Sequence, residues 1–374
     1  MKTVFNNRGK GWPRMRLLLS LSTLFLIVVV TASVLAAFAL NHSKEPQLQS
    51  HIKPTRTVPA PSPTATATPK VDPGFGFTVA GDYGQTTYTT ANLNYIAQQY
   101  AAKKINFHLA VGDFSYNTSV SAVAWSVYAK SHLPSNFPFE VLSGGHDDTQ
   151  IDAYAANMPN HIGKITGTYA KQYYFDYPQQ SPLARIILVT PSEVLSGYSY
   201  GKGDADYNWV ANAIDTARTA HIHWIIVAMH QYCFVIDSTS CASQDLLDLL
   251  LSKHVDLILQ AQKHNYQASK QLALNSACPV LPITSYNAHC VVNASTHMSK
   301  GAGSVIVVSG TGGTTPLLAI DTTSDPKINY FRNWMGSNIN QSWGVSQFTI
   351  TSTRLTMHFA NVTGKFTDGF TVSG

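Results

Sequence analysis

The architecture of this chain is most clearly indicated by FHLAVGDFSY, residues 107–116, in which a short apolar run stops at Gly112 and Asp113. An apolar run of this length, followed by a turn signal, is typical of a buried strand. In an open α/β sheet the carboxyl ends of neighbouring strands converge on one crevice, where ligands bind. Four more apolar runs stop at a residue that can bind a metal: FTVAG at Asp82, EVLSGG at His146, WIIVAM at His230 and LILQAQK at His264. The sequence therefore predicts one site built from two aspartates and three histidines, a donor set that suits Zn, Mn or Fe.

Strands and helices alternate along the chain from about residue 75. Apolar runs predict strands at 77–80, 107–111, 139–142, 173–175, 186–189, 224–228, 255–259 and 304–308, and helical spacing predicts helices at 89–103, 123–131, 206–220 and 244–253. The last runs, 347–350, 355–359 and 366–372, predict antiparallel strands. We therefore expect one α/β domain, residues 74–374, in which two mixed β-sheets pack face to face between outer helices, a four-layer α/β/β/α sandwich.

Residues 17–40 form an uncharged run of 24 residues, long enough to cross a membrane, which takes about 20. Five basic residues and no acid precede this run, so the positive-inside rule predicts a cytoplasmic tail at 1–16 and an extracytoplasmic chain after residue 40. We expect a single-pass transmembrane signal anchor in the cell membrane. The alternative is secretion after signal cleavage near Ala37 and Ala39, although signal cores are shorter, about 7 to 15 residues.

Residues 41–73 are rich in Pro, Thr and Ser and lack the apolar area of a packed core. Their prolines favour an extended chain, so this segment is predicted to be a linker between membrane and domain.

The net charge of +5 belongs to the tail, because removing its five basic residues from 25 leaves 20, equal to the 20 acidic residues. The remaining chain is neutral, and no nucleic-acid partner is expected.

All four cysteines lie in the predicted domain: Cys233, Cys241, Cys278 and Cys290. An even count in an oxidising compartment suggests two disulfides. Local pairing, Cys233 with Cys241 and Cys278 with Cys290, is favoured because both stretches read as loops. Zinc binding by these cysteines competes with this interpretation, but no CxxC spacing is present.

Five short motifs occur in order: GDYG at 81–84, GDFSY at 112–116, GGHD at 144–147, VAMH at 227–230 and AQKH at 261–264. Together they resemble the motifs GDxG, GDxxY, GNH[DE], VxxH and GHxH of calcineurin-like metallophosphoesterases, in their purple acid phosphatase branch. The resemblance extends from about residue 75 to the end. It implies two metals that share Asp113, with the first held by Asp82, Asp113, Tyr116 and His264.

The second metal position departs from the family pattern. The resemblance implies ligands at Asp113, His230, the Asn of GNH[DE] and the first His of GHxH, but Gly145 and Gln262 occupy the last two positions. Glycine has no side chain, and an amide oxygen is a weaker donor than imidazole. Because zinc and similar ions take three or four good protein ligands, the sequence predicts one well-formed site and an incomplete second one.

The resemblance places His146 against the substrate, where it stabilises phosphate or protonates the leaving group. Asp147 is expected to orient the His146 ring, as carboxylates do for metal-bound histidines.

The first function hypothesis is an exported, membrane-tethered phosphoesterase that hydrolyses a phosphate ester with metal-activated water. The second is an impaired module that keeps the fold and binds a phosphorylated ligand or a protein partner, as the changes at Gly145 and Gln262 indicate. A generic dinucleotide-binding fold does not fit, because no GxGxxG follows the first strand.

Overall fold

The computed structural model describes residues 74–191 and 197–374. The predicted tail, transmembrane anchor and linker all lie outside the described residues. Within the described part of the chain, no helix has both the length and the apolar character needed to cross a membrane.

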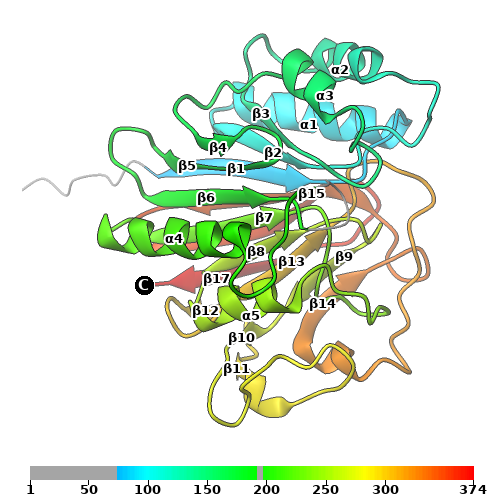
Figure 1. Ribbon diagram of the computed structural model, residues 1–374. Helices are drawn as coiled ribbons and strands as arrows, with labels where there is room; N and C mark the ends of the chain where they lie inside the picture. Colours follow the sequence, from blue (N-terminus) through cyan, green and yellow to red (C-terminus); the bar gives the residue numbers. More distant parts are fainter. Residues whose placement is uncertain (1–73, 192–196) are drawn as a thin grey trace, which may run out of the picture. The chain divides into compact units, whose positions relative to one another are not determined.

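Two large β-sheets form the centre of the domain (Figure 1). The seven-stranded sheet has the order β12 (His297–Ser299), β17 (Gly369–Ser373), β16 (Arg354–Thr363), β15 (Trp343–Ile350), β1 (Phe75–Ala80), β2 (Phe107–Val111) and β3 (Phe139–Leu142). The eight-stranded sheet has the order β14 (Phe331–Met335), β9 (Tyr266–Ser269), β13 (Val305–Ser309), β8 (Leu257–Gln260), β7 (Trp224–Met229), β6 (Ala184–Val189), β5 (Gln172–Tyr177) and β4 (Thr166–Thr168).

Both sheets are mixed. Strands β1, β2 and β3 are parallel, as are β6, β7, β8 and β13, whereas β15, β16 and β17 pair antiparallel. Because parallel strands end at the same edge of a sheet, the loops that follow β1 to β3 lie together, and so do those that follow β7 and β8. These loops carry the predicted ligands.

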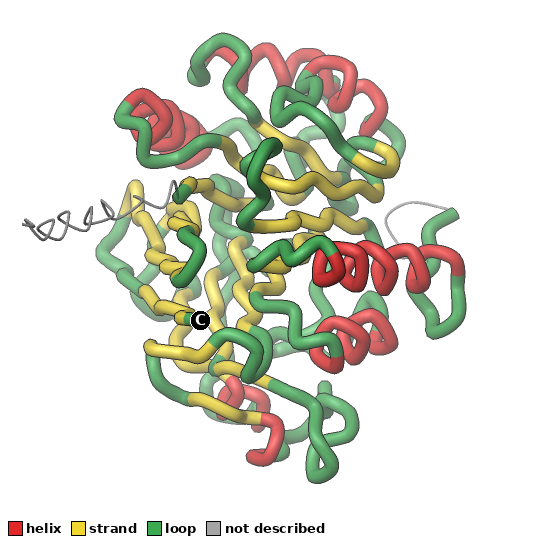
Figure 2. The backbone as a smooth tube through the Cα atoms, turned by 90° about the vertical axis from the view of Figure 1, so that its left-hand side faces the viewer, coloured by secondary structure: helices red, strands yellow, loops and turns green. Residues whose placement is uncertain are grey.

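Side chains alternate between the two faces of each sheet, as the pleat requires. Phe77 of β1 and Ile186 of β6 point into one apolar cluster between the sheets, whereas Ile187 belongs to a cluster on the outer face of its sheet. The helices cover the outer faces. They are α1 (Thr87–Ala101), α2 (Ala122–Ser131) and α3 (Ile151–Asn157) on the seven-stranded sheet, and α4 (Ala205–Thr219) and α5 (Gln244–Ser252) on the other (Figure 2).

The predicted pair of mixed sheets flanked by helices is confirmed, and so are the expected antiparallel strands at the end of the chain. The sequence did not predict α3, β4, β9, β12 or β14, nor the small two-stranded sheet of β10 (Gln271–Leu272) and β11 (Val291–Asn293). All of these are short, and a pattern of two to seven residues shows no clear period.

Both disulfides follow the local pairing, since Cys233 is bonded to Cys241 and Cys278 to Cys290. The first closes a loop after β7, close to the predicted site.

Candidate metal centre

Loops from both sheets bring three predicted ligands to one place. Asp82 follows β1 and Asp113 follows β2 in the seven-stranded sheet, whereas His264 follows β8 in the other sheet. One ligand atom from each of these side chains lies within 4.8 Å of the other two. Both aspartates are buried and His264 is half-buried. The three side chains are therefore close enough to share one metal ion.

The Tyr116 hydroxyl joins this group. It donates a hydrogen bond to Oδ1 of Asp82 at 2.7 Å and lies 2.9 Å from Nε2 of His264. Burial, together with the charges of Asp82 and Asp113, raises the pKa of Tyr116 far above its ordinary value. Burial alone would lower the pKa of His264, but its hydrogen bond with Asp82 and the charges of Asp82 and Asp113 together outweigh burial and raise that pKa. Two carboxylates, an imidazole and a phenol this close together suit a cation, which offsets the repulsion between the negative charges.

Three residues of the centre have a left-handed backbone: Asp82 with φ 66°, Asp113 with φ 55° and Gln262 with φ 63°. Side chains other than glycine rarely adopt this conformation, and it persists where surrounding contacts hold it. Here the Asp82 N–H donates to the carbonyl of Gly112 at 3.0 Å, and the Gln262 N–H donates to Oδ2 of Asp82 at 2.9 Å. The loops are therefore fixed by bonds between the strand ends themselves.

Asp147 holds the backbone of the centre. Its Oδ2 accepts the N–H groups of Asp113 at 2.7 Å and Gly144 at 2.8 Å, and its Oδ1 accepts that of Phe114 at 3.0 Å. The side chain is fully buried. The expectation that Asp147 orients the His146 ring is wrong, because both carboxylate oxygens are taken by backbone donors and fix the Asp113 loop instead.

His230 is positioned by a backbone carbonyl. Its Nδ1 lies 2.8 Å from the carbonyl oxygen of Val111, so Nδ1 carries the proton and Nε2 faces Asp113, 3.4 Å from Oδ2. The buried Nε2 has no hydrogen-bond partner among the described residues. An imidazole fixed through one nitrogen and unpaired at the other has the arrangement of a metal ligand.

His230 and Asp113 also shift each other's titration. Burial opposes the charge on each group, but their mutual attraction outweighs burial, lowering the pKa of Asp113 to about 2 and raising that of His230 to about 9.

His146 is exposed above the centre. Its ring centroid lies 4.7 Å from that of Tyr116, and its backbone N–H donates to Oδ1 of Asp113 at 2.8 Å. The side chain can therefore reach a group bound next to Tyr116, and nothing in its hydrogen bonding ties it to Asp147.

The amino-acid sequence matches no family model. It is 22% identical over 223 residues to purple acid phosphatase 22 of Arabidopsis thaliana, covering 55% of this chain and 48% of that protein. It is 24% identical over 231 residues to purple acid phosphatase 18 of the same plant, covering 58% of this chain and 49% of that one. The chain is thus similar in sequence to purple acid phosphatases, as the order of its motifs implied. It spans about half the length of the curated relatives that it matches.

Solved structures share the fold. The purple acid phosphatase PPD1 from yellow lupin (Lupinus luteus) seeds superposes with a TM-score of 0.61 at 15% identity, covering 81% of this chain and 54% of the lupin protein. GAP50, the anchor in the inner membrane complex of Plasmodium, gives a TM-score of 0.51 at 13% identity over 80% of this chain and 90% of that one.

At the second metal position of the metallophosphoesterase pattern, the structure offers fewer donors. Asp113 and Nε2 of His230 face each other there, but Gly145 supplies no side chain. Gln262 contributes its backbone N–H to Asp82, and its side-chain amide has no hydrogen-bond partner among the described residues. The first position therefore fits a metal ion with four side chains, and the second fits one with two strong donors.

Sequence reasoning missed two supporting groups. The motif pattern does not indicate that the carbonyl of Val111 is the partner of His230, because every residue has a backbone carbonyl and the sequence does not show which one a side chain contacts. The hydrogen bonds by which Asp147 fixes the backbone of Asp113 and Gly144 were missed as well. The position of Asp147 directly after the loop residues 144–146 could have indicated that its side chain stabilises this loop.

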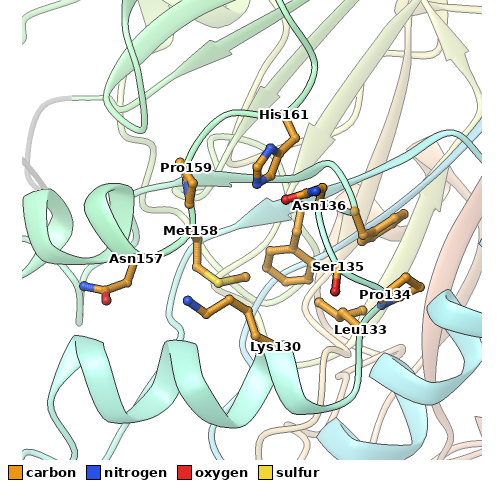
Figure 3. Close-up of a pocket in the computed structure, with 11 residues that line it drawn as sticks. Lys130, Leu133, Pro134, Ser135, Asn136, Asn157, Met158, Pro159 and His161 are labelled. Atoms are coloured by element: carbon orange, nitrogen blue, oxygen red, sulfur yellow. The ribbon is translucent and has the colours of Figure 1, made fainter. Parts of the chain in front are cut away.

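A separate cavity of about 380 Å³ lies away from the centre (Figure 3). Lys130, Leu133, Met158 and His161 line it together with Phe139, the first residue of β3. The metal-binding loops follow the carboxyl end of this strand, whereas the cavity adjoins its amino end. It therefore takes no part in the chemistry of the centre.

Proposed function

We propose that this protein is a metal-dependent phosphoesterase that hydrolyses a phosphate ester with metal-activated water. The observation that carries the proposal is the convergence of Asp82, Asp113 and His264 from two different sheets, joined by the Tyr116 hydroxyl. Oxygen and imidazole donors of this kind suit Fe, Zn or Mn. The purple acid phosphatases with which the chain aligns support the same chemistry.

Asp82, Asp113, Tyr116 and His264 would hold the first metal ion. When bound, such an ion lowers the pKa of a water molecule and polarises phosphate oxygens. The protein's own groups prepare this centre: Asp147 fixes the Asp113 loop, and the carbonyl of Val111 fixes the His230 ring. His146, exposed beside Tyr116, is placed to donate a proton to the leaving group or to stabilise the phosphate.

We propose further that one metal ion is held tightly and a second weakly. Asp113 and His230 alone face the second position, and a stable site takes three or four protein donors.

A binding function without hydrolysis is the second candidate. The loss of side-chain donors at Gly145 favours it, and a neighbour of the same fold, GAP50, is described as an anchor in a membrane complex. Metal content separates the candidates, because a pure binding module has no need of a bound ion.

The proposed location is the cell membrane, with the domain outside it, held by residues 17–40 as a single-pass anchor and by residues 41–73 as a linker. Secretion after signal cleavage remains the alternative. The basic residues before the apolar run and the two disulfides support an extracytoplasmic domain.

The test uses the full chain, purified and loaded with Zn, Mn or Fe, with p-nitrophenyl phosphate as substrate. We expect hydrolysis that disappears with a chelator and returns with metal, and about one tightly bound equivalent of metal per chain. The matched control is Asp113→Ala, which removes a carboxylate that faces both positions. Turnover equal to that of the control, with no metal retained, would refute the enzyme and favour the binding module.

A further inference from the structure

Two cavities adjoin the metal centre. One, of about 330 Å³, is lined by the loops that follow β7 and β8, including Gln231, Tyr232, Ser240 and Gln262. The other, of about 310 Å³, is lined by the loops that follow β1, β2 and β13, including Gln85, Tyr116, Asn117 and Thr315. Their volumes fall at the lower end of the range for small-molecule pockets, roughly 300 to 1,000 Å³, so each suits a group of sugar or polyol size.

Both cavities connect to the centre through its own residues. Gln262, in the first cavity, donates its backbone N–H to Asp82 at 2.9 Å, and Gln231 directly follows His230. In the second cavity Tyr116 itself forms part of the wall. The two cavities therefore border the metal ligands from different sheets, and a ligand with its phosphate at the centre can extend into both.

The cavity walls are polar and carry no charge. Neither cavity is lined by a Lys, Arg, Asp or Glu side chain within the described parts of the chain. Amides and hydroxyls line them instead. Gln231 lies in the wall of the first cavity and is only 8% exposed. Its amide can both donate and accept a hydrogen bond, and so can a hydroxyl, so a ligand hydroxyl can pair with it in either direction.

The charge of the centre favours a singly charged phosphate. The two carboxylates, Asp82 and Asp113, balance one divalent ion, and the depleted second position adds little further positive charge. A phosphate monoester carries close to two negative charges at neutral pH, whereas a phosphodiester carries one. Extra phosphates, as in a nucleoside triphosphate, would need basic side chains that the two cavities do not supply.

We infer that the substrate of this centre is a phosphodiester whose two substituents are uncharged and rich in hydroxyl groups, such as two polyols or sugars. This inference rests on the proposed phosphoesterase function and names its substrate class. In the reaction a water oxygen forms a bond to phosphorus and the bond from phosphorus to one substituent oxygen breaks. The leaving alkoxide takes up a proton, which gives one alcohol and one phosphate monoester.

The experiment compares four substrates on the metal-loaded full chain: glycerophosphoglycerol, glycerol 3-phosphate, ATP and p-nitrophenyl phosphate. We expect kcat/KM for glycerophosphoglycerol to exceed that for glycerol 3-phosphate and ATP by tenfold or more. Calorimetry with the phosphonate analogue of glycerophosphoglycerol, in which a methylene replaces one ester oxygen, measures binding independently of turnover.

Two variants probe the cavities, one each. Gln231→Met and Thr315→Val keep the side-chain size and remove the hydrogen-bonding group. Each should lower the ratio of kcat/KM for glycerophosphoglycerol to that for p-nitrophenyl phosphate by about threefold to tenfold, and weaken analogue binding by a similar factor. The matched control is Gln98→Met, an exposed glutamine on α1, which should leave both quantities unchanged.

The outcomes separate the two proposals. Hydrolysis of p-nitrophenyl phosphate without a preference for glycerophosphoglycerol over glycerol 3-phosphate overturns this inference and leaves the phosphoesterase in place. No metal-dependent hydrolysis of any ester overturns the phosphoesterase, and calorimetry then decides the ligand class. Analogue binding that both cavity variants weaken supports the two uncharged subsites, and an analogue that does not bind overturns them.

Discussion

Replacing Glu140 with glutamine should stabilise this protein at pH 8 and change it little at pH 4. Glu140 lies on β3 with its side chain fully buried, and its Oε1 accepts the N–H of His161 at 3.0 Å. Burial raises the pKa of Glu140 from 4.5 to about 7, against the His161 N–H, which lowers it. Glutamine has nearly the same shape and cannot ionise.

The magnitude follows from the two protonation equilibria. A pKa raised from 4.5 to about 7 corresponds to on the order of 3 kcal/mol, at about 1.4 kcal/mol for each tenfold change. Below pH 4.5 both the folded and the unfolded protein hold the proton, so the charge has no effect. Between pH 4.5 and 7 the unfolded chain ionises first, and the free energy of unfolding falls as pH rises. Above pH 7 Glu140 is ionised in the folded protein as well, and the buried carboxylate lowers the free energy of unfolding by the full amount.

The assay is urea denaturation of wild type and Glu140→Gln at several pH values between 4 and 8, followed by tryptophan fluorescence with the disulfides intact. Other groups titrate equally in both proteins, so the difference in the free energy of unfolding isolates Glu140. We expect this difference to grow by about 2 to 3 kcal/mol in favour of the variant between pH 4 and pH 8.

The matched control is Asp152→Asn, whose side chain is 84% exposed and which should give a nearly flat difference. A constant offset between wild type and Glu140→Gln would mean that burial does not hold the proton on Glu140. A difference that grows in the opposite direction would mean that the carboxylate is stabilised where it lies, and either result refutes the reasoning.

Three further predictions concern the centre. Tyr116→Phe removes the hydroxyl shared by two metal ligands and should weaken metal binding about tenfold or more in a competition titration; unchanged affinity would remove Tyr116 from the ligand set. His146→Ala should lower kcat by about 100-fold with the metal content intact, and equal loss of metal would show a ligand instead of a proton donor. The double variant Gly145→Asn with Gln262→His should raise the metal content from about one to about two equivalents. There is room for a side chain at 145, because a Cβ there has only Oδ1 of Asp113 within 4 Å, at 4.0 Å, and histidine tolerates the left-handed backbone at 262. A content that stays at one equivalent would show that more than these two donors is lost.

Some ligands of the centre could be predicted because they depend only on neighbouring residues in the sequence. Asp82 and Asp113 each end an apolar run, and the rule that parallel strands finish at one edge brings such residues together without further information. The role of Asp147 could not be predicted in this way. A carboxylate next to a histidine in the sequence suggests that the two side chains interact. The hydrogen bonds of Asp147 depend instead on which backbone N–H groups face it in the folded loop, and these belong to Asp113, Phe114 and Gly144.

Local sequence patterns were enough to predict the main strands, the helices α1, α2, α4 and α5, the two local disulfides and the identity of the donor atoms, because the period of apolar residues and the chemistry of side chains are local properties. The packing of the two sheets was needed to show that His264 of one sheet reaches Asp82 of the other, that the carbonyl of Val111 fixes His230, and that uncharged cavities border the centre on both sides. Such contacts join residues far apart in the chain, and their distances follow from how two sheets pack against a shared core.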